Sequence, residues 1–180
     1  MKRRGQIWIE TVIYTLIGLS LIGLVLAIVT PKINEFRDRA VIEQTISSLN
    51  AFDAKINEVL SAPGNVRVIE FRMKRGELYF DAPNNKIVFE LNDSRSIFSE
   101  PGVEISIGRI NIITTEGKKE HSVVLSLAYN QNLTYNGDDS LVGRFSAVSI
   151  PYKFAIENRG FQETGEGTTI WIDIKETSQA

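Results

Sequence analysis

The sequence predicts an α+β protein: a long N-terminal helix, with a transmembrane half and an amphipathic half, followed by an antiparallel β-sandwich-like head. Three observations predict this fold: a long uncharged apolar run, a helical spacing of apolar residues after it, and a series of short β-type runs in the rest of the chain. The 180-residue chain therefore divides into a basic leader at 1–5, a transmembrane helix at 6–30, an amphipathic helix at 31–62 and a β domain at 66–175.

The apolar run, TVIYTLIGLSLIGLVLAIVT at residues 11–30, contains no charged side chain. A helix of about 20 residues covers the ~30 Å of hydrocarbon in a bilayer. We therefore predict one membrane-spanning helix, with lipid as a partner. The predicted membrane helix includes Thr11, Leu16, Gly18, Leu21, Gly23, Leu26 and Thr30.

The charges before the apolar run predict its orientation. Lys2, Arg3 and Arg4 precede the run, so the positive-inside rule places the N-terminus in the cytoplasm and everything after Thr30 outside. A conventional secretory signal peptide begins in the same way, but this run is long and no small-x-small cleavage site follows it. We expect a single-pass protein of the cell membrane with an extracytoplasmic C-terminal domain.

The segment after the apolar run is predicted to be an amphipathic helix, because apolar residues recur every three to four positions with charges between them. Pro31 either ends the first helix or kinks one long helix. We expect the apolar stripe to pack the helix onto the β domain, with Ile33 and Phe36 left for neighbouring helices. The stripe consists of Phe36, Ala40, Leu49, Phe52 and Ile56.

The rest of the chain shows a β pattern. Short runs rich in Val, Ile, Phe and Tyr are separated by Gly, Pro and Asn turns, and several alternate apolar and polar residues. Eight or nine strands at this spacing predict an antiparallel sandwich or a strongly curved sheet. The runs are VRVIEFR, ELYF, KIVFEL, VEISI, RINIITT, HSVVLSLAY, RFSAVSI, YKFAIEN and TTIWIDI.

The overall composition excludes several classes of site. The net charge of −2 gives no sign of a basic nucleic-acid-binding face, so we expect no nucleic-acid partner. The absence of cysteine excludes disulfides, iron–sulfur clusters and a cysteine nucleophile, and the single histidine, His121, excludes a site built on several histidines. No catalytic or phosphate-binding motif occurs. We therefore expect neither enzymatic activity nor a cofactor.

The junction Arg3-Arg4-Gly5-Gln6-Ile7-Trp8-Ile9-Glu10 resembles the prepilin-type processing site, or class III signal peptide, of archaeal type IV pilin-like proteins. The resemblance covers about the first 60 residues. It implies that Gly5 ends a cleaved leader, that Gln6 begins the mature chain and that Glu10 is the acidic fifth residue of the family. It also implies a structural subunit of a surface filament, with a prepilin peptidase, the pilus assembly machinery and other copies or related pilins as partners.

Two features of the sequence, the role of Glu10 and the function of the whole chain, each have two interpretations. Glu10 either neutralises the α-amine of Gln6 in a neighbouring subunit and sets the axial register, or caps the first helical turn and snorkels to the membrane surface. The whole chain is either a filament subunit or an unprocessed, single-pass, membrane-anchored extracytoplasmic β domain that binds ligands or acts as a scaffold.

Three polar motifs in the β region are candidate sites. Asn92 and Asn132 each begin an N-x-S/T sequon and are candidates for N-glycosylation, although chance matches are frequent. Asp138-Asp139 offers oxygen ligands for calcium, but the preceding Asn136-Gly137 is more typical of a plain hairpin turn. His121 lies at a predicted strand start, where a surface histidine is the default interpretation.

Overall fold

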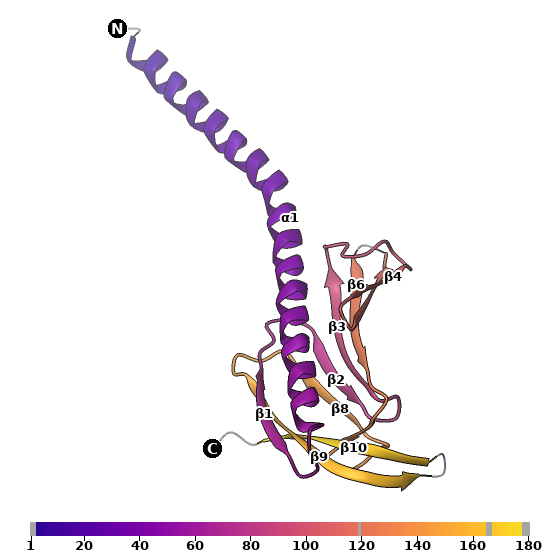
Figure 1. Ribbon diagram of the computed structural model, residues 1–180. Coiled ribbons are helices and arrows are strands. Elements are labelled where there is room, and N and C mark those ends of the chain that lie inside the picture. The colour runs from indigo at the N-terminus through magenta and orange to yellow at the C-terminus, as the bar shows by residue number, and fades with distance from the viewer. Residues whose placement is uncertain (1–2, 119, 165–166, 178–180) are drawn as a thin grey trace. The chain divides into compact units, whose positions relative to one another are not determined.

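The computed structural model (Figure 1) describes residues 3–118, 120–164 and 167–177. It confirms the α+β fold class, because one long N-terminal helix precedes two β-sheets in which antiparallel pairing dominates. The chain divides into two units, residues 1–37 and residues 38–180. Met1 and Lys2 of the predicted leader lie outside the described residues.

The helix α1 runs from Arg3 to Val59 and continues through Pro31. Of the two alternatives for Pro31, the structure therefore shows the continuous helix, even though an internal proline removes one backbone hydrogen bond at a cost of about 3 kcal/mol. A kink at Pro31 stays a prediction. The helix ends three residues before the predicted limit at 62.

The C-terminal end of α1 is held by Asn158, a buried residue of the later strand β9 (Tyr152–Thr164). The Asn158 side-chain amide donates to the carbonyl oxygen of Val59 at 2.9 Å. Its backbone accepts from the Gly64 N–H at 2.7 Å and donates to the Asn65 carbonyl at 2.9 Å. Asn158 therefore satisfies one of the last helical carbonyls, which have no partner inside the helix.

Ten strands follow among the described residues and form two sheets (Figure 1). The four-stranded sheet has the order β1-β9-β10-β7, and the six-stranded sheet has the order β4-β5-β6-β3-β2-β8. All pairs are antiparallel except β7 with β10. The remaining bounds are β1 Val66–Phe71, β2 Glu77–Asp81, β3 Lys86–Ser94, β4 Glu104–Ile107, β5 Ile110–Glu116, β6 His121–Ala128, β7 Asn132–Tyr135, β8 Val142–Ser146 and β10 Gly167–Glu176.

All nine predicted runs overlap strands, and the strand that the prediction missed is β7. Its sequence, Asn-Leu-Thr-Tyr, alternates polar and apolar residues but is only 4 residues long, too short for the alternation to be told from a turn. It becomes a strand because Trp171 to Ile174 of β10 pair with it in parallel. Such long-range pairing leaves little trace in a local pattern.

The core forms where α1 meets both sheets. Phe52 of α1 lies 5.6 Å from Phe80 of β2 and 6.1 Å from Phe154 of β9, measured between ring centroids. Phe80 and Phe154 themselves stand edge to face at 4.9 Å, a favourable aromatic geometry. The fully buried side chains of α1 are Ile42, Leu49, Phe52, Ile56 and Val59.

The predicted packing stripe is correct at Leu49, Phe52 and Ile56 but wrong at Ala40, which is exposed. The buried face instead continues toward the N-terminus through Ile42, because Ile42 lies about two turns before Leu49 and on the same side of the helix, whereas Ala40 lies about two and a half turns before it and on the opposite side.

The buried face of α1 begins at Asp38, a carboxylate only 2% exposed. It accepts hydrogen bonds from the Arg75 guanidinium and from the Arg95 backbone N–H, the latter at 2.8 Å. A buried charge costs several kcal/mol unless it is paired. Asp38 thus ties the first packed turn of α1 to the β1–β2 connection and to the segment that follows β3.

Candidate assembly surface and polar pocket

The first unit presents an apolar helical surface. Its large apolar side chains are exposed from Trp8 to Val29, including Leu16, Leu21 and Leu26. The helix is long and apolar enough to cross a membrane, and none of its most apolar window is buried within the chain. A signal sequence near the N-terminus meets the same criteria of length and hydropathy. A contiguous apolar surface of this extent is typical of a membrane or protein contact.

The polar groups of this segment suit an apolar environment. Thr15 donates its hydroxyl to the Thr11 carbonyl at 2.8 Å, and Thr30 donates to the Leu26 carbonyl at 2.7 Å. Each hydroxyl is therefore satisfied within its own helix, which avoids the cost of several kcal/mol for an unpaired polar group in hydrocarbon.

The two glycines of the apolar segment are not required by packing inside the chain. A Cβ atom added at Gly18 or at Gly23 would meet no heavy atom within 4 Å. Small residues on a membrane helix permit the close approach of another helix. These positions therefore leave room for the close approach of another helix.

The predicted processing and register residues lie in the first turns of α1. Gly5 and Gln6 belong to the helix, but their side chains lie outside the described part of the structure. The side chain of Glu10 is exposed and makes no ion pair with any described residue. The two alternatives for Glu10 stay predictions.

In the second unit, a charged cluster crosses the four-stranded sheet around Asp173 of β10, which is fully buried. The carboxylate accepts from the Gly137 N–H at 2.7 Å, the Thr134 hydroxyl at 2.9 Å, Arg159 at 2.7 Å and Lys175 at 3.2 Å. Burial raises the pKa of Asp173, but these hydrogen bonds and cations together outweigh it and hold the pKa below its ordinary value of 3.8. Because protein donors already occupy both carboxylate oxygens of Asp173, this cluster has a structural role.

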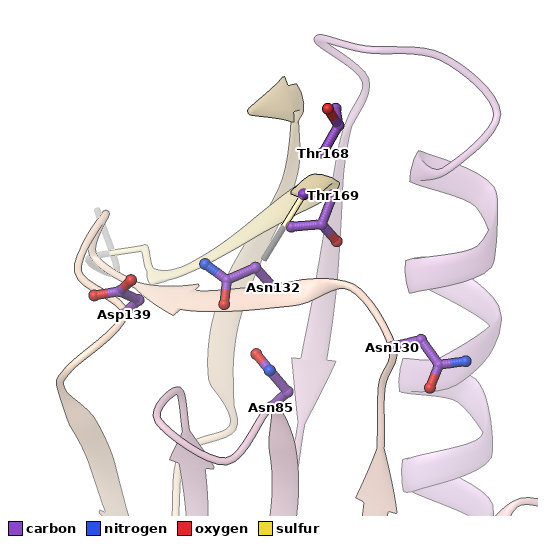
Figure 2. A pocket seen from close by; sticks show the side chains of 7 residues that line it. Asn85, Asn130, Asn132, Asp139, Thr168 and Thr169 are labelled. Atoms are coloured by element: carbon purple, nitrogen blue, oxygen red, sulfur yellow. The ribbon is translucent and has the colours of Figure 1, made fainter. Parts of the chain in front are cut away.

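A polar pocket of about 390 Å³ lies beside β7 and the start of β10 (Figure 2). Asn85, which holds a left-handed backbone conformation with φ of 51°, accepts from the Leu133 N–H through its side-chain oxygen at 2.8 Å. Amide and hydroxyl side chains of this kind hydrogen-bond neutral polar ligands. The pocket is lined by Asn85, Asn130, Asn132, Asp139, Gly167, Thr168 and Thr169.

The structure favours the hairpin-turn interpretation of the Asp138-Asp139 motif. Tyr135 and Asp138 exchange two backbone hydrogen bonds, of 2.9 and 3.2 Å, across Asn136 and Gly137, which both have positive φ. This is the two-residue hairpin geometry that Asn-Gly prefers. One Asp138 oxygen already accepts from the Ser140 hydroxyl and backbone N–H. No group of three potential ligands suited to a metal occurs among the described residues.

Both sequons place their asparagine on a strand and bury their hydroxyl residue. Asn92 is exposed on β3, but Ser94 is fully buried and donates to the Ser96 carbonyl at 3.1 Å. Asn132 is half-buried on β7, and Thr134 is buried against Asp173. Because the motif includes that hydroxyl, glycosylation at either site requires modification before the strand folds. Both sites stay predictions.

Comparison of the chain with protein-family models, with curated proteins and with solved structures found no match.

Proposed function

We propose that this chain is a pilin-like structural subunit of a type IV pilus-type filament or a related surface complex. It is inserted in the membrane through its N-terminal helix before assembly. The observation that carries the proposal is the change of environment along one helix: α1 is uncharged and exposed from Thr11 to Thr30, and buries one face in a β domain from Asp38 onward. The exposed part suits lipid first and neighbouring helices afterwards.

The residues around Gly5 support processing of this subunit. The basic residues Arg3 and Arg4 hold the N-terminus in the cytoplasm, and a prepilin peptidase cleaves after Gly5. Cleavage removes the positive charges of Lys2, Arg3 and Arg4, which changes the net charge from −2 to −5. It also creates an α-amine at Gln6, with which Glu10 of a neighbouring copy pairs. The partners in this proposal are lipid, other copies or related pilins, the peptidase and the assembly machinery.

The alternative is a membrane-anchored, unprocessed binding or scaffold module, and the polar pocket in Figure 2 is the observation that favours it. Neither proposal assigns the chain an enzymatic activity or a cofactor, because its sequence contains no catalytic motif.

The N-terminal residue of the membrane-expressed protein distinguishes the two functions. The full chain is produced with and without a prepilin peptidase, and the intact mass is measured. We expect a chain that begins at Gln6 only with the peptidase, and surface filaments by electron microscopy only in that strain. Gly5→Leu should block cleavage, whereas Ile7→Leu, as the matched control, should not. An intact leader in the presence of the peptidase would favour the anchored module.

A further inference from the structure

A two-stranded arm extends beyond the four-stranded sheet at the β9–β10 turn (Figure 1). β1 pairs with β9 only as far as Glu157, and β7 pairs with β10 only from Trp171 onward. The described outer residues, 161–164 and 167–170, pair across the hairpin with each other. A two-stranded ribbon is marginal in water by itself. The arm therefore gains most from a partner that covers it.

A β-bulge decides which face of the arm carries Phe161. Ile172 pairs with Asn158, whereas Ile170 pairs with Phe161, so β9 holds one extra residue between these pairs. Residues directly opposite each other in an antiparallel pair share a face. Phe161 therefore continues the face of Ile172, but Ile172 is 0% exposed and Phe161 is 68% exposed. The apolar row of the core runs out onto the arm and ends uncovered.

A pocket of about 400 Å³, here called the loop pocket, lies at the other end of β9, beside the β8–β9 connection. Its volume is in the range that admits an aromatic group. Val148 on its wall and the neighbouring Ile150 are exposed apolar residues. The lining residues are Arg72, Met73, Lys74, Ala147, Val148 and Ser149.

The arm and the loop pocket carry opposite charges. Glu163 is exposed on the arm, two residues after Phe161, and Arg72 and Lys74 are exposed at the pocket. None of these three side chains forms an ion pair within the described part of the chain. Complementary charges of this kind specify partner and register.

One chain cannot join its own arm and loop pocket. Tyr152, which follows the pocket, and Phe161 lie nine positions apart on one extended strand, a separation of about 30 Å at ~3.3 Å per residue. We propose that Phe161 of one copy docks in the loop pocket of the next copy, with Glu163 facing Arg72 and Lys74. This inference rests on the proposed filament function, because such a head-to-tail contact propagates along a row of copies unless the rotation closes a ring.

Cysteine cross-linking in the full chain tests this contact, because the native sequence has no cysteine. The test variant carries Thr168→Cys and Val148→Cys, because exposed Thr168 pairs with Glu163 on the face of Phe161 and its substitution keeps both docking side chains. The control carries Thr168→Cys and Ile107→Cys, which places the second thiol on the exposed edge strand β4. Filaments are sheared from cells, sedimented, imaged and treated with copper-phenanthroline. We expect a ladder of covalent oligomers from the test variant and no ladder from the control.

Filament yield is measured separately from cross-linking, so that failure of the docking contact can be distinguished from failure of the proposed filament function. Filaments of the test variant without a ladder, or with as much cross-linking as in the control, would overturn the docking contact and leave the filament function intact. Failure of the unsubstituted processed chain to form filaments would overturn the filament function and the docking contact together.

Charge reversal provides a second test that needs no cross-link. Glu163→Lys and Lys74→Glu should each lower the filament yield several-fold, and the two together should restore it. Glu104→Lys, an exposed residue of β4, is the matched control and should leave the yield unchanged. A double variant as impaired as either single variant would overturn the pairing of the arm with the loop pocket.

Discussion

The side-chain amide of Asn158 donates to the carbonyl oxygen of Val59 at 2.9 Å, across 99 positions of sequence. This contact joins the last turn of α1 to the strand on which the bulge occurs. The Asn158 side-chain oxygen also accepts from the Gly160 N–H at 2.8 Å. One buried amide therefore secures both the end of the helix and the bulge that precedes the arm.

Asn158→Ala should destabilise the β domain by about 1–3 kcal/mol, because it leaves the buried Val59 carbonyl without a donor. Urea denaturation of the full chain in detergent, monitored by circular dichroism or by the fluorescence of Trp8 and Trp171, measures the change. Asn57→Ala is the matched control, since Asn57 is exposed and makes only a 3.3 Å bond to Asp53 on its own helix. Equal stability of the two variants would contradict the capping role.

Asp38→Ala should also destabilise the protein, by about 2–3 kcal/mol. This is less than the 3–5 kcal/mol for breaking a fully buried pair, because Arg75 remains partly solvated. The loss should fall on the first packed turns of α1, with faster amide hydrogen exchange there than in the strands. Glu43→Ala, which removes an exposed ion pair with Arg39, should cost under about 1 kcal/mol. Unchanged amide hydrogen exchange in the first packed turns of α1 of the Asp38→Ala variant would refute the anchoring role.

Asp173 predicts an acid-sensitive contribution to stability. Because its folded pKa lies below the ordinary 3.8, the carboxylate stabilises the fold above that pH, and this contribution is lost as the pH falls through the folded pKa. Asp173→Asn should be less stable at neutral pH and should lose less stability than the native chain on acidification below about pH 4. Thermal unfolding between pH 2 and pH 7 measures both effects, with the exposed Asp139→Asn as the control. Parallel pH profiles for the native and Asp173→Asn chains would contradict this role.

Glu10→Ala should reduce filament assembly without changing the stability of the β domain, if Glu10 sets the axial register. The same substitution at Glu35, which lies on the same helix and pairs with Lys32, is the matched control and should assemble normally. Sheared filament yield and subunit spacing by electron microscopy are the measurements. Normal yield and spacing for Glu10→Ala would support the capping alternative instead.

Much of the fold was predictable because it rests on local periodicity. The apolar spacing of α1 and the nine β-type runs are repeated over several residues each, so single exceptions do not hide them. One error lies within the local pattern itself: Ala40 stands nine residues, about two and a half turns, before Leu49 and so on the opposite side of the helix, whereas Ile42 stands seven residues, about two turns, before Leu49 and is buried. The other error, β7, arises because β7 is a strand only through its pairing with β10.

The sites show the same division. Gly5, Gln6 and Glu10 lie within six consecutive residues, so the sequence shows this motif without a structure. The Asp173 cluster and the polar pocket draw residues from strands and turns that are far apart, such as Asn85 and Thr168. Buried Asp38 looks like an ordinary solvated charge in the helical pattern, and only its contacts with Arg75 and Arg95 reveal its role.

The order of residues along the chain was enough to predict an uncharged apolar helix at residues 11–30 and a β domain after it, because hydrophobicity and turn chemistry act over neighbouring residues. The pairing of β7, the bulge beside Asn158 and the face on which Phe161 stands depend on contacts between residues far apart in sequence, and they are visible in the folded chain alone. A single extra residue in a strand reverses the faces of all residues beyond it, and only the pairing with β10 shows where that residue lies.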